Sequence, residues 1–223
     1  MSSPRLVATW LESRSSFRCP SRLPSETTDP GLVWNGHTIW SITLSIILGY
    51  DPSTLRERVD LLAAGTRLDE LGDLRSLSAL NEKVVLLRLV GRLDEAWEVA
   101  NEAVRQARFT GDREQLLGAR IRRAQVLQFQ GKLDEAITEL SGCVDEARTH
   151  GWTALEAFAV QNRGKSHFDQ HDYESALTDF TAAVFLREKL GASSADLETS
   201  LIAVAVVESF LDEQRRSRKD TVE

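Results

Sequence analysis

The chain has 223 residues, of which 42% are hydrophobic and 27% charged, a composition that can bury a sizeable core in one domain. Its net charge of −7 argues against general nucleic-acid binding, because such binding depends on clustered Lys and Arg. The two cysteines, Cys19 and Cys143, lie far apart in segments of different character, so we expect no disulfide framework and a reducing, cytoplasmic environment.

Residues 1–33 are rich in Ser, Pro and Arg and are predicted to be a disordered tail. An organelle transit peptide or an over-extended start site would also give such a composition, but Glu12, Glu26 and Asp29 argue against the transit peptide. The apolar stretch from Ile39 to Tyr50 is shorter than the roughly 20 residues that span a bilayer. We therefore expect no membrane span.

A weakly patterned helix pair is predicted next, over about residues 37–72. Its first helix would run from His37 to Leu48 and its second from Ser53 to Leu71, with Gly49 to Pro52 as the turn between them. If the rest of the domain left it uncovered, the apolar stretch from Ile39 to Tyr50 would be a candidate homodimer interface.

Three copies of one short motif follow at a spacing of 40 residues. They begin at Gly91 (Gly-Arg-Leu-Asp-Glu-Ala), Gly131 (Gly-Lys-Leu-Asp-Glu-Ala) and His171 (His-Asp-Tyr-Glu-Ser-Ala). A second series of landmarks keeps the same spacing: Gly111, Gly151 and Gly191. Apolar residues recur at helical spacing on both sides of each motif, so each unit is predicted to be two helices with the motif as the turn between them.

Small residues fall in register where the two helices of each unit would cross. They are Ala96, Ala136 and Ala176, then Ala103, Cys143 and Ala183, and in the first helices Ala124 and Gly164. In this respect the chain resembles the tetratricopeptide repeat (TPR) family over about residues 73–190. The 40-residue unit is similar to the longer-helix subclass found in kinesin light chains and in bacterial regulators with repeat arrays. The resemblance implies an all-α fold, a right-handed α-solenoid of antiparallel helix pairs.

The chain is predicted to end in a capping helix over about residues 195–214, followed by a charged tail at residues 215–223. Leu201, Val204, Val207 and Leu211 would form the apolar side of this helix. A solenoid needs such a cap, because its last unit would otherwise expose an apolar face to water. The repeat domain as a whole is predicted to cover residues 34–214.

The resemblance implies that the first helices line a concave groove. The polar residues that would face it are Asn81, Arg88, Arg122, Gln125, Gln128, Gln161, Asn162 and Lys165. Amide side chains can pair with the backbone of a bound peptide, and Arg122 and Lys165 can take a carboxylate. The alternative is that these residues are ordinary solvated positions.

The expected function is that of an adaptor or scaffold that binds a peptide segment of a partner protein. The alternative is a regulatory module that senses a short peptide or small molecule, as bacterial relatives of the longer-repeat type often do. Some members of the family bind the C-terminal carboxylate of chaperones with a fixed set of Lys and Asn residues. This chain lacks that set in consecutive repeats, so we do not expect chaperone-tail binding.

Other features favour a structural interpretation over chemistry. The sequence has no Gly-rich phosphate loop, nucleophile elbow or paired-Cys motif, so we expect neither an enzyme nor a cofactor. His167 and His171 have the spacing of a helical metal pair, but they occupy a packing position and a turn position of the repeat, so no metal is expected. Cys143 is expected to be a packing thiol, and the basic residues 120–123 a solvated face.

Overall fold

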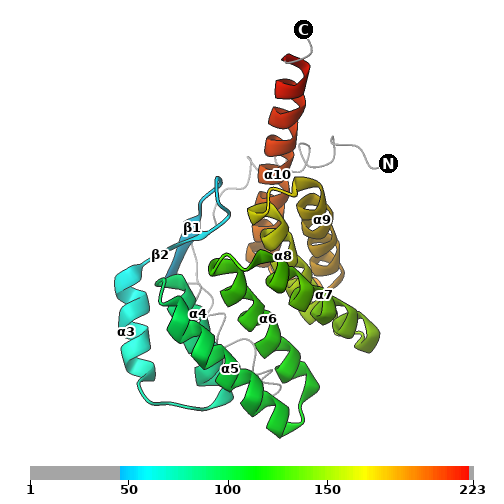
Figure 1. Cartoon of the computed structure of the whole chain (residues 1–223). Coiled ribbons are helices and arrows are strands. Elements are labelled where there is room, and N and C mark those ends of the chain that lie inside the picture. The colour runs from blue at the N-terminus through cyan, green and yellow to red at the C-terminus, as the bar shows by residue number, and fades with distance from the viewer. Residues whose placement is uncertain (1–45, 221–223) are drawn as a thin grey trace, which may run out of the picture. The chain divides into compact units, whose positions relative to one another are not determined.

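Eight helices and one two-stranded hairpin make up the part of the chain that the computed structural model describes, residues 46–220 (Figure 1). Strands β1 (Ile47–Tyr50) and β2 (Glu57–Val59) come first. The helices are α3 (Leu61–Leu71), α4 (Leu77–Leu89), α5 (Leu93–Thr110), α6 (Arg113–Phe129), α7 (Leu133–His150), α8 (Thr153–Asp169), α9 (Tyr173–Lys189) and α10 (Ser194–Asp220). Apart from the hairpin, the fold is all-α, as predicted.

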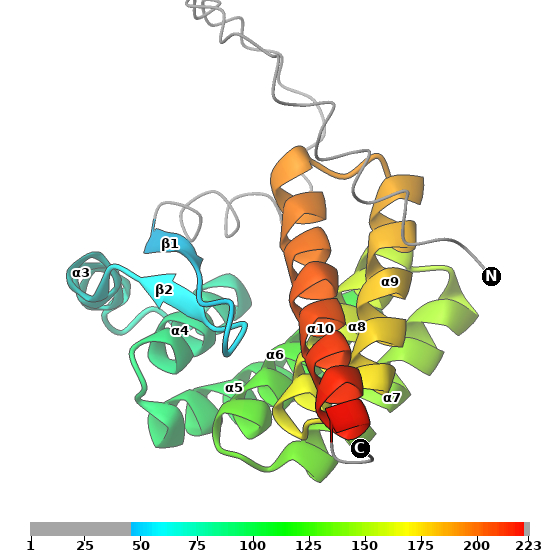
Figure 2. The same ribbon diagram turned by 90° about the horizontal axis from the view of Figure 1, so that it is seen from above.

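The helices pack in consecutive pairs that coincide with the 40-residue units. Helices α4 and α5, α6 and α7, and α8 and α9 form the three pairs, and each pair also packs on the next. The first helices α4, α6 and α8 contact one another in turn. They therefore share one face, toward which the hairpin lies, while α5, α7 and α9 lie farther from it (Figure 2).

Equivalent polar contacts recur at the same 40-residue spacing. Arg163 in α8 pairs with Asp179 of α9 at 2.7 Å and donates a hydrogen bond to Ser141 of α7 at 3.2 Å. Arg123 in α6, 40 residues earlier, makes the corresponding contacts to Glu139 and Asn101. An arginine of the first helix thus joins its own second helix to that of the preceding unit.

The turn inside each unit uses the left-handed backbone conformation, which the sequence predicts at Gly91 and Gly131. Gly91 and Gly131 have φ values of 79° and 77°, and His171 at the third turn has a φ of 62°. His171 is one of two described non-glycine residues with positive φ, and its Nδ1 lies 3.0 Å from the Tyr173 hydroxyl. The third turn therefore repeats the glycine geometry with a residue that is strained in it.

Replacing His171 with Gly is expected to raise the free energy of unfolding by about 1 kcal/mol, because glycine adopts positive φ without a Cβ clash. Gly131→His should lower it by a similar amount, and the pair can be compared by urea unfolding followed by circular dichroism. A loss of stability in His171→Gly would instead mean that the contact with Tyr173 outweighs the backbone strain.

The N-terminal helix pair predicted for residues 37–72 is partly wrong. Helix α3 begins at Leu61, because Asp60 caps it by accepting hydrogen bonds from the amides of Leu62 and Ala63. The preceding residues 47–59 form the hairpin. Asp51 accepts hydrogen bonds from the amide and hydroxyl of Ser53 and thereby holds a turn that overlaps the predicted one, Gly49 to Pro52, whereas the residues from Ser53 to Val59 were expected to be helical. Residues 37–45 of the predicted first helix lie outside the described residues.

The hairpin pairs antiparallel, with Tyr50 opposite Glu57 and a bulge between Ile47 and Gly49. Residues directly opposite each other in a ladder point to the same face of the sheet, so the side chains of Tyr50 and Glu57 lie on one face of the hairpin.

Most of the predicted dimer interface from Ile39 to Tyr50 lies outside the described residues, as does the predicted tail 1–33. Of the described part, Leu48 is 64% exposed.

The C-terminal helix is longer than the sequence analysis predicted. Helix α10 packs on α9 and runs to Asp220, so the charged residues 215–220 continue the helix and are not a separate tail. Figure 1 shows its last turns extending beyond the other helices. Val204, Val207 and Leu211 are buried against α9, as expected for a cap. Within residues 46–220, no helix is both long and apolar enough to cross a membrane.

Candidate functional site

The eight residues predicted to line a groove lie on α4, α6 and α8, and we call the surface that they form the first-helix face. Six of them are at most 8% exposed: Asn81, Arg88, Gln125, Gln128, Gln161 and Asn162. Arg122 and Lys165 are half-buried. The alternative that these are ordinary solvated positions is therefore wrong. The hairpin also covers part of this face.

Three of the amides are held by hydrogen bonds within the helical array. Gln125 donates to the side chain of Asn162 at 2.7 Å, and Asn162 donates to the backbone carbonyl of Phe158 at 2.7 Å. The Ser200 hydroxyl of α10 donates to Gln161 at 2.7 Å. These residues fix neighbouring helices to one another, although Gln161 Nε2 is buried without a hydrogen-bond partner among the described residues.

Glu57 of β2 joins two residues of the first-helix face. Its carboxylate accepts from Arg88 of α4 at 3.2 Å and from Lys165 of α8 at 3.1 Å, across 31 and 108 residues of sequence. All three side chains are at most 12% exposed. Burial alone would raise the pKa of Glu57, but the two cations outweigh it and hold the pKa well below its ordinary value.

Arg56 makes the neighbouring contact to the same face. It pairs with Asp169 at the end of α8 at 2.5 Å, and Gln128 donates to the same carboxylate oxygen at 2.9 Å. Its guanidinium lies 3.9 Å from the centre of the Phe129 ring. Burial lowers the pKa of Arg56 and raises that of Asp169 despite their attraction, so desolvation offsets much of this ion pair.

The turn residue Leu55 supplies an apolar contact. It is 4% exposed and belongs to a cluster with Phe168, Tyr173 and residues of α10. It adopts a φ of 53°, a strained conformation for leucine. On the other strand, Tyr50 is hydrogen-bonded to Thr199 of α10, and its ring lies 5.6 Å from the Lys165 ammonium. The hairpin therefore contacts α4, α6, α8 and α10.

Arg122 is a cation of the first-helix face, and it receives no carboxylate from the hairpin. Among the described residues it has no carboxylate within ion-pair distance, and it donates to the Gly118 carbonyl at 2.9 Å. The guanidinium lies 5.7 Å from the centre of the Phe158 ring. Burial lowers the pKa of Arg122 to about 10. Such a desolvated cation would gain from a carboxylate supplied by another molecule.

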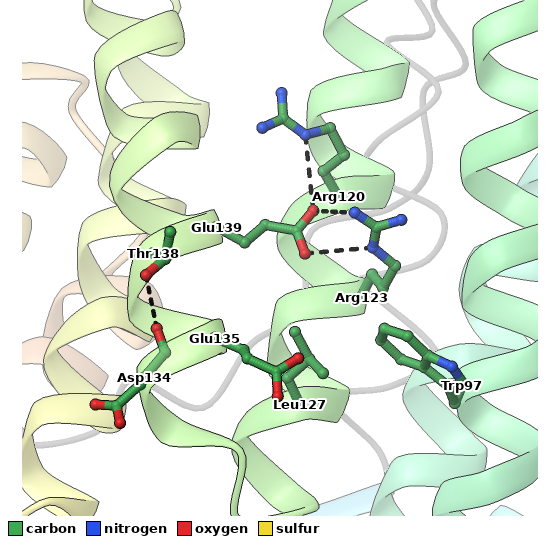
Figure 3. A pocket seen from close by; sticks show the side chains of 8 residues that line it. All are labelled: Trp97, Arg120, Arg123, Leu127, Asp134, Glu135, Thr138 and Glu139. Atoms are coloured by element: carbon green, nitrogen blue, oxygen red, sulfur yellow. Dashed lines mark hydrogen bonds and ion pairs between the residues drawn. The ribbon is translucent and has the colours of Figure 1, made fainter.

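A pocket of about 740 Å³ lies on the other side of α6, between α5 and α7 (Figure 3). Arg120 and Arg123 reach into it and both pair with Glu139, beside the Trp97 ring. Arg120 also pairs with Glu146 at 2.7 Å. The prediction that residues 120–123 form a solvated face is thus wrong, because these arginines are paired and partly buried.

The cysteine and the histidines that were considered for catalysis or metal binding are engaged in packing and polar contacts. Cys143 is fully buried at a helix crossing, and burial raises the pKa of its thiol to about 12. His167 lies 3.7 Å from Asp172, while His171 contacts Tyr173. Within residues 46–220, no group of three or more His, Cys, Asp and Glu side chains has the arrangement of a metal site.

Sequence reasoning missed the hairpin contacts of Tyr50, Leu55, Arg56 and Glu57. A usable signal was present: the turn-forming run Asp-Pro-Ser at residues 51–53 separates two short stretches that carry Ile, Tyr and Val, residues typical of strands. The turn itself was predicted, at Gly49 to Pro52, but the segments on either side of it were assigned to helices and not to strands.

The fold and this site define an all-α protein of consecutively packed helix pairs whose first helices hold an extended segment. No family model matches the chain, and no curated protein matches its sequence. The crystal structure of BtubC (BKLC) from P. vanneervenii is similar, with 18% sequence identity, a TM-score of 0.50 and coverage of 72% of each chain. At this identity the likeness concerns the fold alone.

Proposed function

We propose that this chain is a TPR-like right-handed solenoid that works as an adaptor and binds an extended segment of a partner protein on its first-helix face. The coincidence of the 40-residue sequence period with the helix pairs supports the solenoid. Buried small residues at the crossings support the resemblance, among them Ala96, Ala136 and Ala176. Gly164 belongs with them, because a Cβ there would lie 2.9 Å from the Phe180 ring.

One observation carries the binding proposal. The first-helix face already holds an extended segment, since Glu57 of the hairpin is clamped between Arg88 and Lys165. The same face carries Arg122, which has no carboxylate partner in the described part of the chain. A face built from desolvated cations and amides suits a protein segment with an acidic side chain.

Affinity capture from a lysate of the source organism tests this function with the full chain as bait. Arg122→Gln should lose the captured partner, because it removes the unpaired cation while keeping a polar side chain of similar length. Arg105→Gln on the exposed side of α5 is the matched control and should retain it. Circular dichroism should show both variants folded. A partner retained equally by both variants would mean that binding does not use the first-helix face.

A further inference from the structure

The tripeptide 55–57 has the features of a bound recognition segment. Leu55 places an apolar side chain in a buried cluster, Arg56 pairs with Asp169, and Glu57 sits between two cations. Leu55 and Glu57, whose buried side chains anchor the hairpin, are two positions apart in the sequence. These contacts reach helices of the first and third units, so the segment binds across the array and not to one helix.

The contacts of the hairpin are also of a kind that a competing segment could replace. Much of the contact is ionic, and desolvation offsets a large part of what buried ion pairs contribute. Arg56 Nη1 and Arg88 Nε are buried without a hydrogen-bond partner among the described residues. Leu55 is strained, and a two-stranded hairpin of this size is only marginally stable by itself. Another segment could satisfy Arg88 at least as well, and Arg56 would be rehydrated when the hairpin leaves the face.

We propose that the hairpin, residues 47–59, is an intramolecular occupant of the first-helix face that the partner must displace. The displacing segment is an extended stretch of protein with an apolar residue and, two positions later, a carboxylate, in the manner of Leu55 and Glu57. This inference rests on the proposed function and specifies its ligand. The tethered hairpin then sets an affinity threshold, because a linked segment competes at an effective concentration on the order of millimolar.

The test uses a fluorescein-labelled peptide of residues 46–60 and fluorescence anisotropy with the full chain. The hairpin variant carries Leu55→Ser and Glu57→Gln, which remove the two anchors. Release of its hairpin is checked by trypsin, which should cleave after Arg56 and Arg58 faster than in the wild type. We expect the peptide to bind the hairpin variant at least about tenfold more tightly than the wild type, because the competing tethered copy is gone.

Two controls locate the binding. A peptide with the same two substitutions should bind neither protein. Adding Lys165→Gln to the hairpin variant should abolish binding of the unmodified peptide, whereas adding Lys132→Gln, on the exposed turn before α7, should leave it unchanged. If circular dichroism shows the double variant unfolded, Glu57→Gln alone replaces it, with a smaller expected gain.

The proposal is overturned if the hairpin stays protected from trypsin in the variant, or if a released hairpin leaves a folded chain that does not bind the peptide. Equal binding to wild type and variant, or indifference to Lys165→Gln, also overturns it. These failures are distinct from failure of the adaptor function. A partner lost specifically with Arg122→Gln would uphold that function even if the hairpin proves to be a fixed part of the fold.

Discussion

Phe180→Ala is expected to lower the free energy of unfolding by about 4 kcal/mol, the size typical of a large aromatic removed from a core. Phe180 lies in α9, is fully buried and packs with Tyr173 and Val207. Its ring also fills the space that the missing side chain of Gly164 leaves in α8. The substitution would therefore open a cavity at the joint of α8, α9 and α10.

Phe185→Ala on the same helix is the matched control, because that ring is 65% exposed. Urea unfolding should show a large loss for the first variant and almost none for the second. Hydrogen exchange should rise most in α9 and α10, since repeat units stabilise mainly their neighbours. A loss below about 1 kcal/mol for Phe180→Ala would mean that the helices close over the cavity.

Glu57→Gln is expected to release the hairpin at neutral pH. Removing one partner of a buried charge group costs about 3–5 kcal/mol when the remaining charges stay buried. Here Arg88 and Lys165 would be left facing an amide, and undocking of the hairpin is the way to rehydrate them. The loss is therefore limited to the free energy of docking, and the helix pairs should stay folded.

Hydrogen exchange measured by mass spectrometry would show this as faster exchange in residues 47–59 with little change in α6 and α7. Glu95→Gln, which breaks the exposed pair with Arg92, is the control and should change neither segment. If residues 47–59 exchange as slowly in Glu57→Gln as in the wild type, the Glu57 carboxylate is not the main contact that holds the hairpin.

The same carboxylate predicts a pH dependence. Because the folded pKa of Glu57 lies below its unfolded value of about 4.3, its contribution is complete above that pH and is lost as pH falls below it. The difference in hairpin protection between wild type and Glu57→Gln should accordingly shrink from pH 5 toward about pH 3. Asp169 acts in the opposite sense, since burial raises its pKa, so the comparison with Glu57→Gln is needed to isolate Glu57.

The sequence by itself determined the helix pairs, because their information is local and repeated. Turn residues at Gly91, Gly131 and His171 and small side chains at the crossings recur every 40 residues, and helical spacing of apolar residues supplies the rest. The sequence also placed the polar residues on the first helices. It erred in α10, whose end has no glycine or proline to stop the helix before Asp220.

Only the tertiary structure decided which groups the polar residues of the first-helix face contact. Whether Arg88 and Lys165 meet solvent, a partner or their own chain depends on the path of residues 47–59, and no periodicity encodes the meeting of Glu57 with a lysine 108 residues away. Ion pairing across such distances in the chain is fixed by packing of the whole array and not by local preference. The sequence thus determined the helical scaffold and the polar residues on it, whereas the tertiary structure determined that the hairpin of the same chain pairs with those residues.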